Sequence, residues 1–151
     1  RGVAALGGGV RGGSAGCGCA IAGAKQALLE NKEISRIYLV GNTADIHAAL
    51  PERGFRDHRV KIVHASEVVE MDDKPVVALR KKKDSSMVRA VELVKDGEAD
   101  AVISPGNTGG IYAAATIKLR PFPGGSSGAS ATVTPAPNKG VVRLDSGASV
   151  Q

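Results

Sequence analysis

The stretch Ala101-Val102-Ile103-Ser104-Pro105-Gly106-Asn107-Thr108-Gly109 passes from a short apolar run through a glycine-containing turn into a segment, Asn107 to Leu119, that we predict to be a helix. The same order of apolar run, turn and helix recurs along the chain. Strands that are spaced by helices predict a parallel sheet with right-handed crossovers. The strands predicted in this way are Val3 to Leu6, Ile37 to Val40, Val60 to Val63, Ala101 to Ile103 and Gly140 to Leu144.

The predicted helices lie between these strands. A glycine-dense loop, Gly7 to Gly18, precedes a helix rich in Ala and Leu from Ala20 to Glu30. Another helix begins at a cap formed by Asp84 or Ser85, and Gly97 is its natural stop. Its apolar side chains share one face because they recur at helical spacing, at Met87, Ala90, Val91 and Val94. The shorter helical segments are one through Leu50, capped by Asn42 or Thr43 and ended by Pro51 to Gly54, and a turn from Val77 to Lys82 after Pro75.

The composition is that of a globular α/β protein. The chain has 151 residues, of which 42% are apolar and only 3% aromatic, so the core must consist mainly of aliphatic side chains. We therefore expect residues 1–151 to form a single α/β domain or the N-terminal part of a larger one. The segment Pro121 to Asn138 is rich in Pro, Gly, Ser and Thr, which predicts a loop or linker.

Charge and hydropathy indicate what kind of partner the protein binds and where in the cell it is expected. The net charge of +5 and the pI near 9.4 favour an anionic partner. No stretch approaches the roughly 18 apolar residues of a membrane-spanning helix, and the glycine-rich N-terminus lacks the apolar core of a secretory signal. We expect a cytoplasmic protein. Few aromatic residues and a single basic cluster argue against nucleic acid as the partner.

Two patterns that often hold cofactors are weak in this chain. Cys17 and Cys19 are too close for an ordinary disulfide, and two ligands do not make a zinc site, so we expect no metal. The pattern Gly7-x-Gly9-x-x-Gly12 formally matches a dinucleotide-binding loop. That pattern also requires an acidic residue at the end of the second strand to bind the ribose. Glu30 and Glu33 are the candidates, and neither lies at that position. We therefore reject NAD as a cofactor.

Two segments have the character of anion-binding sites. The segment from Lys82 to Ser86 combines cations and hydroxyl groups at a helix start, and the segment from Gly106 to Gly109 offers backbone N–H groups where a strand leads into a helix. In parallel sheets ligands bind at the carboxyl ends of the strands. The segments expected to converge there are the Gly7 loop, Gly41 to Thr43, His64 to Glu67, the loop from Ser104 to Gly110, and Asp145 to Gly147. The cationic turn from Lys81 to Ser86 could reach the same rim from the intervening segment. A phosphate or acyl phosphate suits such a place.

Each of these features also has a purely structural interpretation. The run Arg80 to Lys83 could be a solvated face, and the turn at Gly106 could be only a connection between strand and helix. The adjacent carboxylates Asp72 and Asp73 could form a loop or pair with the lysines, and they do not imply a metal. His64 could be a core or rim residue rather than a catalytic base.

A series of motifs between Ile62 and Ala114 is far more specific than any single glycine pattern. The motifs are His64-Ala65-Ser66-Glu67, Glu70-Met71-Asp72-Asp73-Lys74-Pro75, Lys82-Lys83-Asp84-Ser85-Ser86-Met87, Gly97-Glu98-Ala99-Asp100-Ala101 and Gly106-Asn107-Thr108-Gly109. Together they resemble the PlsX-type phosphate acyltransferases of bacterial phospholipid synthesis. Members of that family are much longer, and this chain would cover roughly their first half.

This resemblance implies a fold, a reaction and partners. The fold is a three-layer α/β/α Rossmann-like arrangement with a mostly parallel sheet, as in isocitrate and isopropylmalate dehydrogenases, here incomplete. The reaction is transfer of a fatty acyl group from acyl-carrier protein to inorganic phosphate, which gives an acyl phosphate. The resemblance also implies a homodimer that associates peripherally with the membrane, and neither a metal nor a nucleotide cofactor.

On this hypothesis the site residues have distinct roles. The cations and hydroxyl groups of the segment Lys82 to Ser86 would bind the phosphate. The segment Gly106 to Gly109 would donate hydrogen bonds to the phosphate or to the oxyanion. Lys83 and Asn107 are the predicted catalytic residues. The predicted substrate-binding residues are Asp73 and Lys74 at the rim, Lys82, Ser85 and Ser86 on the first segment, and Gly106, Thr108 and Gly109 on the second.

The chain departs from the family pattern at its two ends. Where the family has Asp-Ala-Met-Gly-Gly-Asp, this chain has Ala4-Ala5-Leu6-Gly7-Gly8-Gly9, and the segment Leu144 to Gln151 also loses an acidic residue and an amide. Two alternatives therefore stay open. One is an enzyme similar to phosphate acetyl- or butyryltransferases that uses acyl-coenzyme A, and the other is a catalytically inactive anion-binding fragment.

Overall fold

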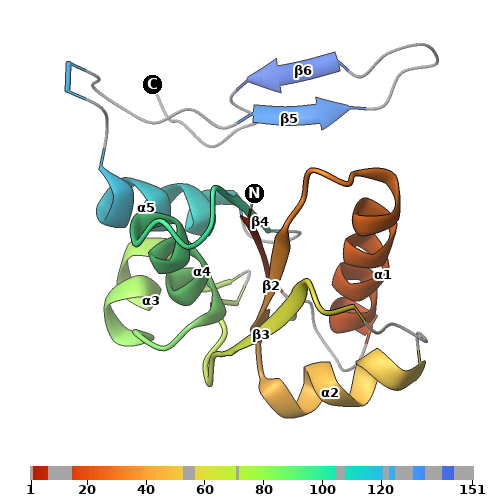
Figure 1. Cartoon of the computed structure of the whole chain (residues 1–151). Coiled ribbons are helices and arrows are strands. Elements are labelled where there is room, and N and C mark those ends of the chain that lie inside the picture. Colours follow the sequence, from red (N-terminus) through yellow and green to blue (C-terminus); the bar gives the residue numbers. More distant parts are fainter. Residues whose placement is uncertain are drawn as a thin grey trace.

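The computed structural model describes residues 2–6, 15–52, 57–70, 72–104, 108–120, 123–124, 131–134 and 141–144. Strands and helices alternate through most of this range (Figure 1). In chain order the elements are β1 (Gly2–Leu6), α1 (Ala15–Glu30), β2 (Arg36–Gly41), α2 (Thr43–Glu52), β3 (Val60–His64), α3 (Pro75–Lys81), α4 (Ser86–Lys95), β4 (Ala101–Ile103), α5 (Thr108–Leu119), β5 (Ala131–Thr134) and β6 (Val141–Leu144).

The first four strands form one parallel sheet in the order β3-β2-β1-β4. The pairing of β1 runs from Gly2 opposite Arg36 to Leu6 opposite Val40, and β3 lies on the other side of β2. All four strands therefore end on the same side of the sheet. Chain order and spatial order differ because the chain returns across the sheet after β3, so that β4 pairs with the edge of β1 that β2 does not occupy.

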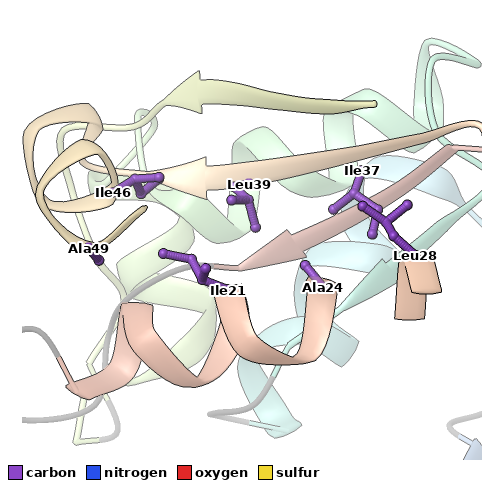
Figure 2. Packing of buried hydrophobic residues seen from close by; sticks show 7 residues of the cluster. All are labelled: Ile21, Ala24, Leu28, Ile37, Leu39, Ile46 and Ala49. Atoms are coloured by element: carbon purple, nitrogen blue, oxygen red, sulfur yellow. The ribbon is translucent and has the colours of Figure 1, made fainter. Parts of the chain in front are cut away.

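The central strand β2 shows why both faces of the sheet are covered. Ile37 and Leu39 pack among residues of α1 and α2, in the cluster that Figure 2 shows. The alternate residues Tyr38 and Val40 point to the other face, where they pack with Ala90 of α4. Side chains alternate along a strand, so a strand that is apolar at every position needs helices on both sides. This arrangement confirms the predicted incomplete three-layer α/β/α fold.

The helices on the second face form a small core of their own. Leu79 of α3, Met87 and Val91 of α4 and Ala114 of α5 are buried together. Figure 1 shows α3, α4 and α5 grouped on one side of the sheet and α1 and α2 on the other. The predicted face of α4 is confirmed, since Met87, Ala90 and Val91 are buried and Val94 is partly buried.

Several helix ends lie where the sequence predicts them. The side chain of Ser85 accepts a hydrogen bond from the backbone N–H of Val88 and caps α4, and Gly97 follows that helix with a φ of +78°. Asn42 caps α2, with its Oδ1 3.0 Å from the N atom of Ala44. The helix α1 begins earlier than predicted, at Ala15 rather than Ala20, and α2 runs through Pro51 to Glu52.

The prediction that Gly140 to Leu144 forms a fifth strand of the parallel sheet is wrong in its pairing. Residues Val141–Leu144 do form a strand, β6, but it pairs antiparallel with β5 in a separate two-stranded sheet. Parallel strands need a crossover of about a dozen residues or more, and the connection between Thr134 and Val141 is shorter than that. The strand β5 lies inside the segment Pro121 to Asn138, which the sequence predicts to be a loop or linker. The division into domains stays a prediction.

Candidate functional site

The carboxyl ends of β2 and β3 lie side by side, since Gly41 is opposite His64 in the register. The backbone N–H of Thr43 donates to Nδ1 of His64 at 3.3 Å, and the Thr43 hydroxyl lies 2.9 Å from the same nitrogen. An amide N–H can only donate, so Nδ1 of His64 is the acceptor in the hydrogen bond with the backbone of Thr43. His64 is exposed, which places it at the rim of this end of the sheet.

Asp84 joins the segment after β3 to the start of α4. Its Oδ2 accepts hydrogen bonds from the hydroxyl of Ser66 at 2.5 Å and from the backbone N–H of the same residue at 3.0 Å. Its Oδ1 accepts from Nε of Arg89 at 2.7 Å. The Ser66 hydroxyl and N–H and the Arg89 guanidinium hold the pKa of the Asp84 carboxyl far below its usual range. The carboxylate therefore stays ionised and fixes two segments that lie far apart in the sequence.

The backbone reinforces this connection. Glu67 and Ser85 form a parallel bridge, in which the N–H of Ser86 donates to the carbonyl of Glu67 at 3.0 Å. The carboxylate of Glu67 accepts from the backbone N–H of Asp84 at 3.1 Å. Ser85 is fully buried and Ser86 is 4% exposed, so both lie beneath the surface of this segment. The capping role of Ser85 is confirmed, and a phosphate-binding role for either hydroxyl stays a prediction.

Lys82 is held by two acceptors. Its Nζ donates to the carboxylate of Asp73 at 2.6 Å and to the carbonyl of Val68 at 2.9 Å. The same carboxylate oxygen accepts from the backbone N–H of Glu70 at 2.9 Å. The hydrogen bond with Lys82 lowers the pKa of Asp73, and the hydrogen bond with Asp73 raises the pKa of Lys82. Ion pairing, one of the two interpretations left open for this acidic pair, is thus what the structure shows for Asp73.

The neighbouring cations differ from Lys82 in their surroundings. Lys83 and Lys74 are exposed, and within the described part of the chain neither has an ion-pair partner. An ammonium has three N–H donors, and two of those on Lys82 are already used. Of the two neighbours Lys82 and Lys83, Lys83 is therefore the one whose charge and N–H donors are available to an anion from solution.

The second predicted anion-binding segment is only partly described. Gly106 and Asn107 lie outside the described residues, and the position of the predicted catalytic amide relative to Lys83 is not tested. Thr108 is the first residue of α5, and Gly109 is exposed in its first turn. The helix α5 itself packs against α3 and α4 through the buried Ala114. The helix α5, which follows the second segment, therefore lies in the same layer as α4, which follows the first segment.

The sequence interpretation missed the hydrogen-bonded group of Ser66, Asp84 and Arg89. The sequence predicts Asp84 or Ser85 as the cap of α4, whereas the described side-chain partners of Asp84 are Ser66 and Arg89. The spacing between Asp84 and Arg89 is five residues, outside the i, i+3 and i, i+4 pairs that pattern reading detects, and Ser66 is distant in sequence. Only the folded chain brings the three side chains together.

The described ranges contain neither a candidate metal-binding cluster nor a candidate membrane-spanning helix. Among those residues no group of three or more His, Cys, Asp or Glu side chains could hold a metal ion. In the part of the chain that the structure describes, no helix has both the length and the apolar character that crossing a membrane requires.

Comparison with known proteins gives a consistent result. The family described as fatty acid synthesis protein matches residues 4–151. A phosphate acyltransferase of Akkermansia muciniphila is 52% identical over 98 residues, which are 65% of this chain and 28% of that protein. A phosphate acyltransferase of Halothermothrix orenii is 42% identical over 130 residues, which are 86% of this chain and 39% of that protein.

A third relative, the phosphate acyltransferase of Shewanella woodyi, is 47% identical over 117 residues, which are 76% of this chain and 34% of that protein. The chain therefore matches between 28% and 39% of the length of these three relatives.

Proposed function

This chain belongs to the fatty acid synthesis protein family, and on that premise we propose that it is part of an enzyme that transfers a fatty acyl group from acyl-carrier protein to inorganic phosphate. The product would be an acyl phosphate for phospholipid synthesis. The observation that carries this proposal is the family match over residues 4–151, together with relatives that are named phosphate acyltransferases. The specific donor and product are our own extension of that family membership.

The described geometry supports different roles for Lys82 and Lys83. Asp73 balances the charge of Lys82, and Asp84 balances that of Arg89. Lys83 lies between these pairs in the sequence and is exposed. We assign Lys83 to hold the phosphate, because an exposed ammonium can form charge-assisted hydrogen bonds with it. Lys82 retains one N–H for the same ligand, and its main role would be to fix the loop that contains Asp73.

The reaction needs no covalent intermediate with the protein. A phosphate oxygen forms a bond to the thioester carbonyl carbon, and the carbonyl oxygen becomes an oxyanion. The carbon–sulfur bond then breaks, the acyl phosphate is released, and the carrier leaves as a thiolate that takes a proton from water. Lys83 would position the nucleophile, and Asn107 with the N–H groups of Gly106 and Gly109 would stabilise the oxyanion.

The direct test is an assay of acyl phosphate formation by the polypeptide that carries these residues. Acyl phosphate is trapped with hydroxylamine after incubation with phosphate and either acyl-carrier-protein thioester or acyl-coenzyme A. Phosphate-dependent product from the carrier-protein thioester supports the proposal. Product from acyl-coenzyme A alone favours the acetyl- or butyryltransferase-like alternative, and phosphate binding without product from either donor favours an inactive anion-binding fragment.

The remaining partners and the location follow from the same resemblance. We propose that the whole protein acts as a homodimer in the cytoplasm and associates peripherally with the membrane. Sedimentation of the protein, alone and with lipid vesicles, tests both points. A monomer that stays in the supernatant with vesicles would contradict them.

A further inference from the structure

One surface of α3 is not used by the proposed reaction. Val76 and Val77 are 47% and 46% exposed, and Arg80 and Lys81 are also exposed. Residues four apart in a helix lie on the same side, so Arg80 follows Val76 and Lys81 follows Val77 along one surface. We refer to these four residues as the α3 outer face. It combines an apolar half with a cationic half.

The helix α3 is placed to expose this face. Its opposite side is buried, since Ala78 and Leu79 pack with residues of α4 and α5. Figure 1 shows α3 on the outside of the molecule, and Ala90 of α4 packs with Tyr38 and Val40 of the sheet. The α3 outer face therefore points away from the core that secures the helix.

The charges of the two cations on this face are not paired with carboxylates of the described residues. Within the described ranges, neither Arg80 nor Lys81 has an ion-pair partner. The nearest carboxylates in sequence with described ion pairs, Asp73 and Asp84, are engaged by Lys82 and Arg89. One guanidinium charge and one ammonium charge beside two exposed valines form a surface that complements an acidic protein with its own apolar patch.

We infer that the α3 outer face docks an acidic protein, and that this partner is the carrier protein which delivers the acyl thioester. The identity of the partner rests on the proposed function. Lys81 is followed two residues later by Lys83, so a partner bound here would lie beside the residue assigned to the phosphate. An anionic lipid surface fits less well, because interfacial helices present a longer apolar face with large side chains, whereas α3 has seven residues and two exposed valines.

The test is a binding measurement that does not depend on turnover. Fluorescently labelled acyl-carrier protein is titrated with the full chain and with Lys81→Glu, and Kd is measured by anisotropy at low and at raised salt. Reversal of one interfacial charge should weaken binding about 5- to 10-fold at low salt and less at high salt. Lys32→Glu is the matched control, because Lys32 is an exposed lysine in the turn after α1, and it should change Kd less than about 2-fold.

A second variant tests the apolar half. Val77→Ser should weaken binding about 3- to 10-fold at every salt concentration, because it removes apolar contact and leaves the charges in place. Circular dichroism checks that each variant keeps its helical signal. Equal Kd values for Lys81→Glu and Lys32→Glu, or no binding by the unchanged chain, would overturn the inference. Loss of binding to anionic vesicles in Lys81→Glu, with carrier-protein binding unaltered, would overturn it in favour of a lipid surface.

The same titration separates this inference from the proposed function. Selective weakening by Lys81→Glu supports the docking surface even if no acyl phosphate forms, and in that case only the proposed reaction fails. Conversely, acyl phosphate formation with a carrier-protein Kd that neither variant changes supports the reaction and overturns the docking surface.

Discussion

At the scale of single residues, Lys82 and Arg89 differ from Lys83 in that each has an ion-pair partner among the described residues. Lys82 and Arg89 each form an ion pair with a carboxylate that also accepts backbone hydrogen bonds. The charge of Lys83 has no such partner among the described residues. Sequence alone could not make this distinction, since Lys82 and Lys83 are identical neighbours and only the position of Asp73 in the folded loop separates them.

This distinction predicts unequal effects on catalysis. In an active protein, Lys83→Ala should lower turnover by roughly ten- to a thousandfold, if the ammonium holds charge that develops in the transition state. Lys95→Ala is the matched control, because Lys95 is an exposed lysine in the last turn of α4, and its rate should stay within about twofold. Steady-state rates with varied phosphate check this prediction. Equal rates for the two variants would remove Lys83 from the site.

The ion pair between Asp73 and Lys82 predicts a dependence of stability on pH. The pKa of Asp73 is lower in the folded protein than its unfolded value of about 3.9, so its stabilising contribution is fully present above that pH and is lost as pH falls through the folded pKa. The pKa of Lys82 is raised, so the contribution is also lost when pH rises beyond the raised lysine pKa. Between these limits both groups are charged.

Asp73→Asn should therefore destabilise the protein near pH 7, and the difference from the unchanged chain should shrink in acid. Asp72→Asn is the control, because Asp72 is an adjacent exposed carboxylate with no ion pair among the described residues. Urea unfolding at several pH values measures both differences. A destabilisation by Asp73→Asn that is the same at pH 7 and pH 3 would mean that the ion pair is not its cause.

At the scale of elements, α1 shows how strongly one face can decide stability. Leu28 is 3% exposed and lies beside Ile37 in the cluster that Figure 2 shows, while its neighbour Leu29 is 72% exposed. Truncation of a buried leucine removes apolar contact and leaves a cavity, whereas truncation of an exposed one leaves only solvent-filled space. The two adjacent residues therefore make a matched pair within the same helix.

Leu28→Ala should lower the free energy of unfolding by about 2–5 kcal/mol, and Leu29→Ala should change it by less than about 0.5 kcal/mol. The substitution is chemically the same, so helix propensity cancels between the two variants. Denaturant unfolding followed by circular dichroism provides the comparison. Similar losses in both variants would show that α1 does not pack on the sheet as the structure has it.

The local sequence pattern predicted which helices and strands form better than it predicted their first and last residues. The apolar run Ile37 to Val40 is buried on both faces and was identified as a strand, and the cap at Ser85 fixed the start of α4. The start of α1 was predicted five residues too late, because Ala15 to Cys19 is rich in glycine and small residues that carry a weak helix signal. Hydrogen bonds between distant segments, such as Ser66 to Asp84, leave no periodic trace in the sequence.

At the scale of the whole molecule, the pairing of strands is the property that local pattern did not determine. The four strands that helices separate were expected to form a parallel sheet, and they do. The strand β6 is also apolar except for Arg143, but β5 precedes it at a short distance in the sequence and pairs with it antiparallel. Choice of partner depends on the length of the connection and on which strand edges are open, and neither is visible in the strand itself.

This division predicts a gradient of local stability. The strand β2 pairs on both sides and is buried on both faces, whereas β5 and β6 pair with each other in a sheet of two strands. An isolated two-stranded hairpin is marginally stable in water, and amide exchange reports the free energy of local opening. Amides of β2 should therefore exchange at least about 100-fold more slowly than those of β5 and β6.

Hydrogen exchange followed by mass spectrometry tests this gradient in the full chain, with peptides that cover Arg36–Gly41, Ala131–Thr134 and Val141–Leu144 compared after correction for their intrinsic rates. The strand β4 is an internal control, because it pairs only with β1 within the described sheet and should exchange at an intermediate rate. If the hairpin were as protected as β2, further contacts would have to stabilise it, and the two sheets would open as one cooperative unit rather than as two.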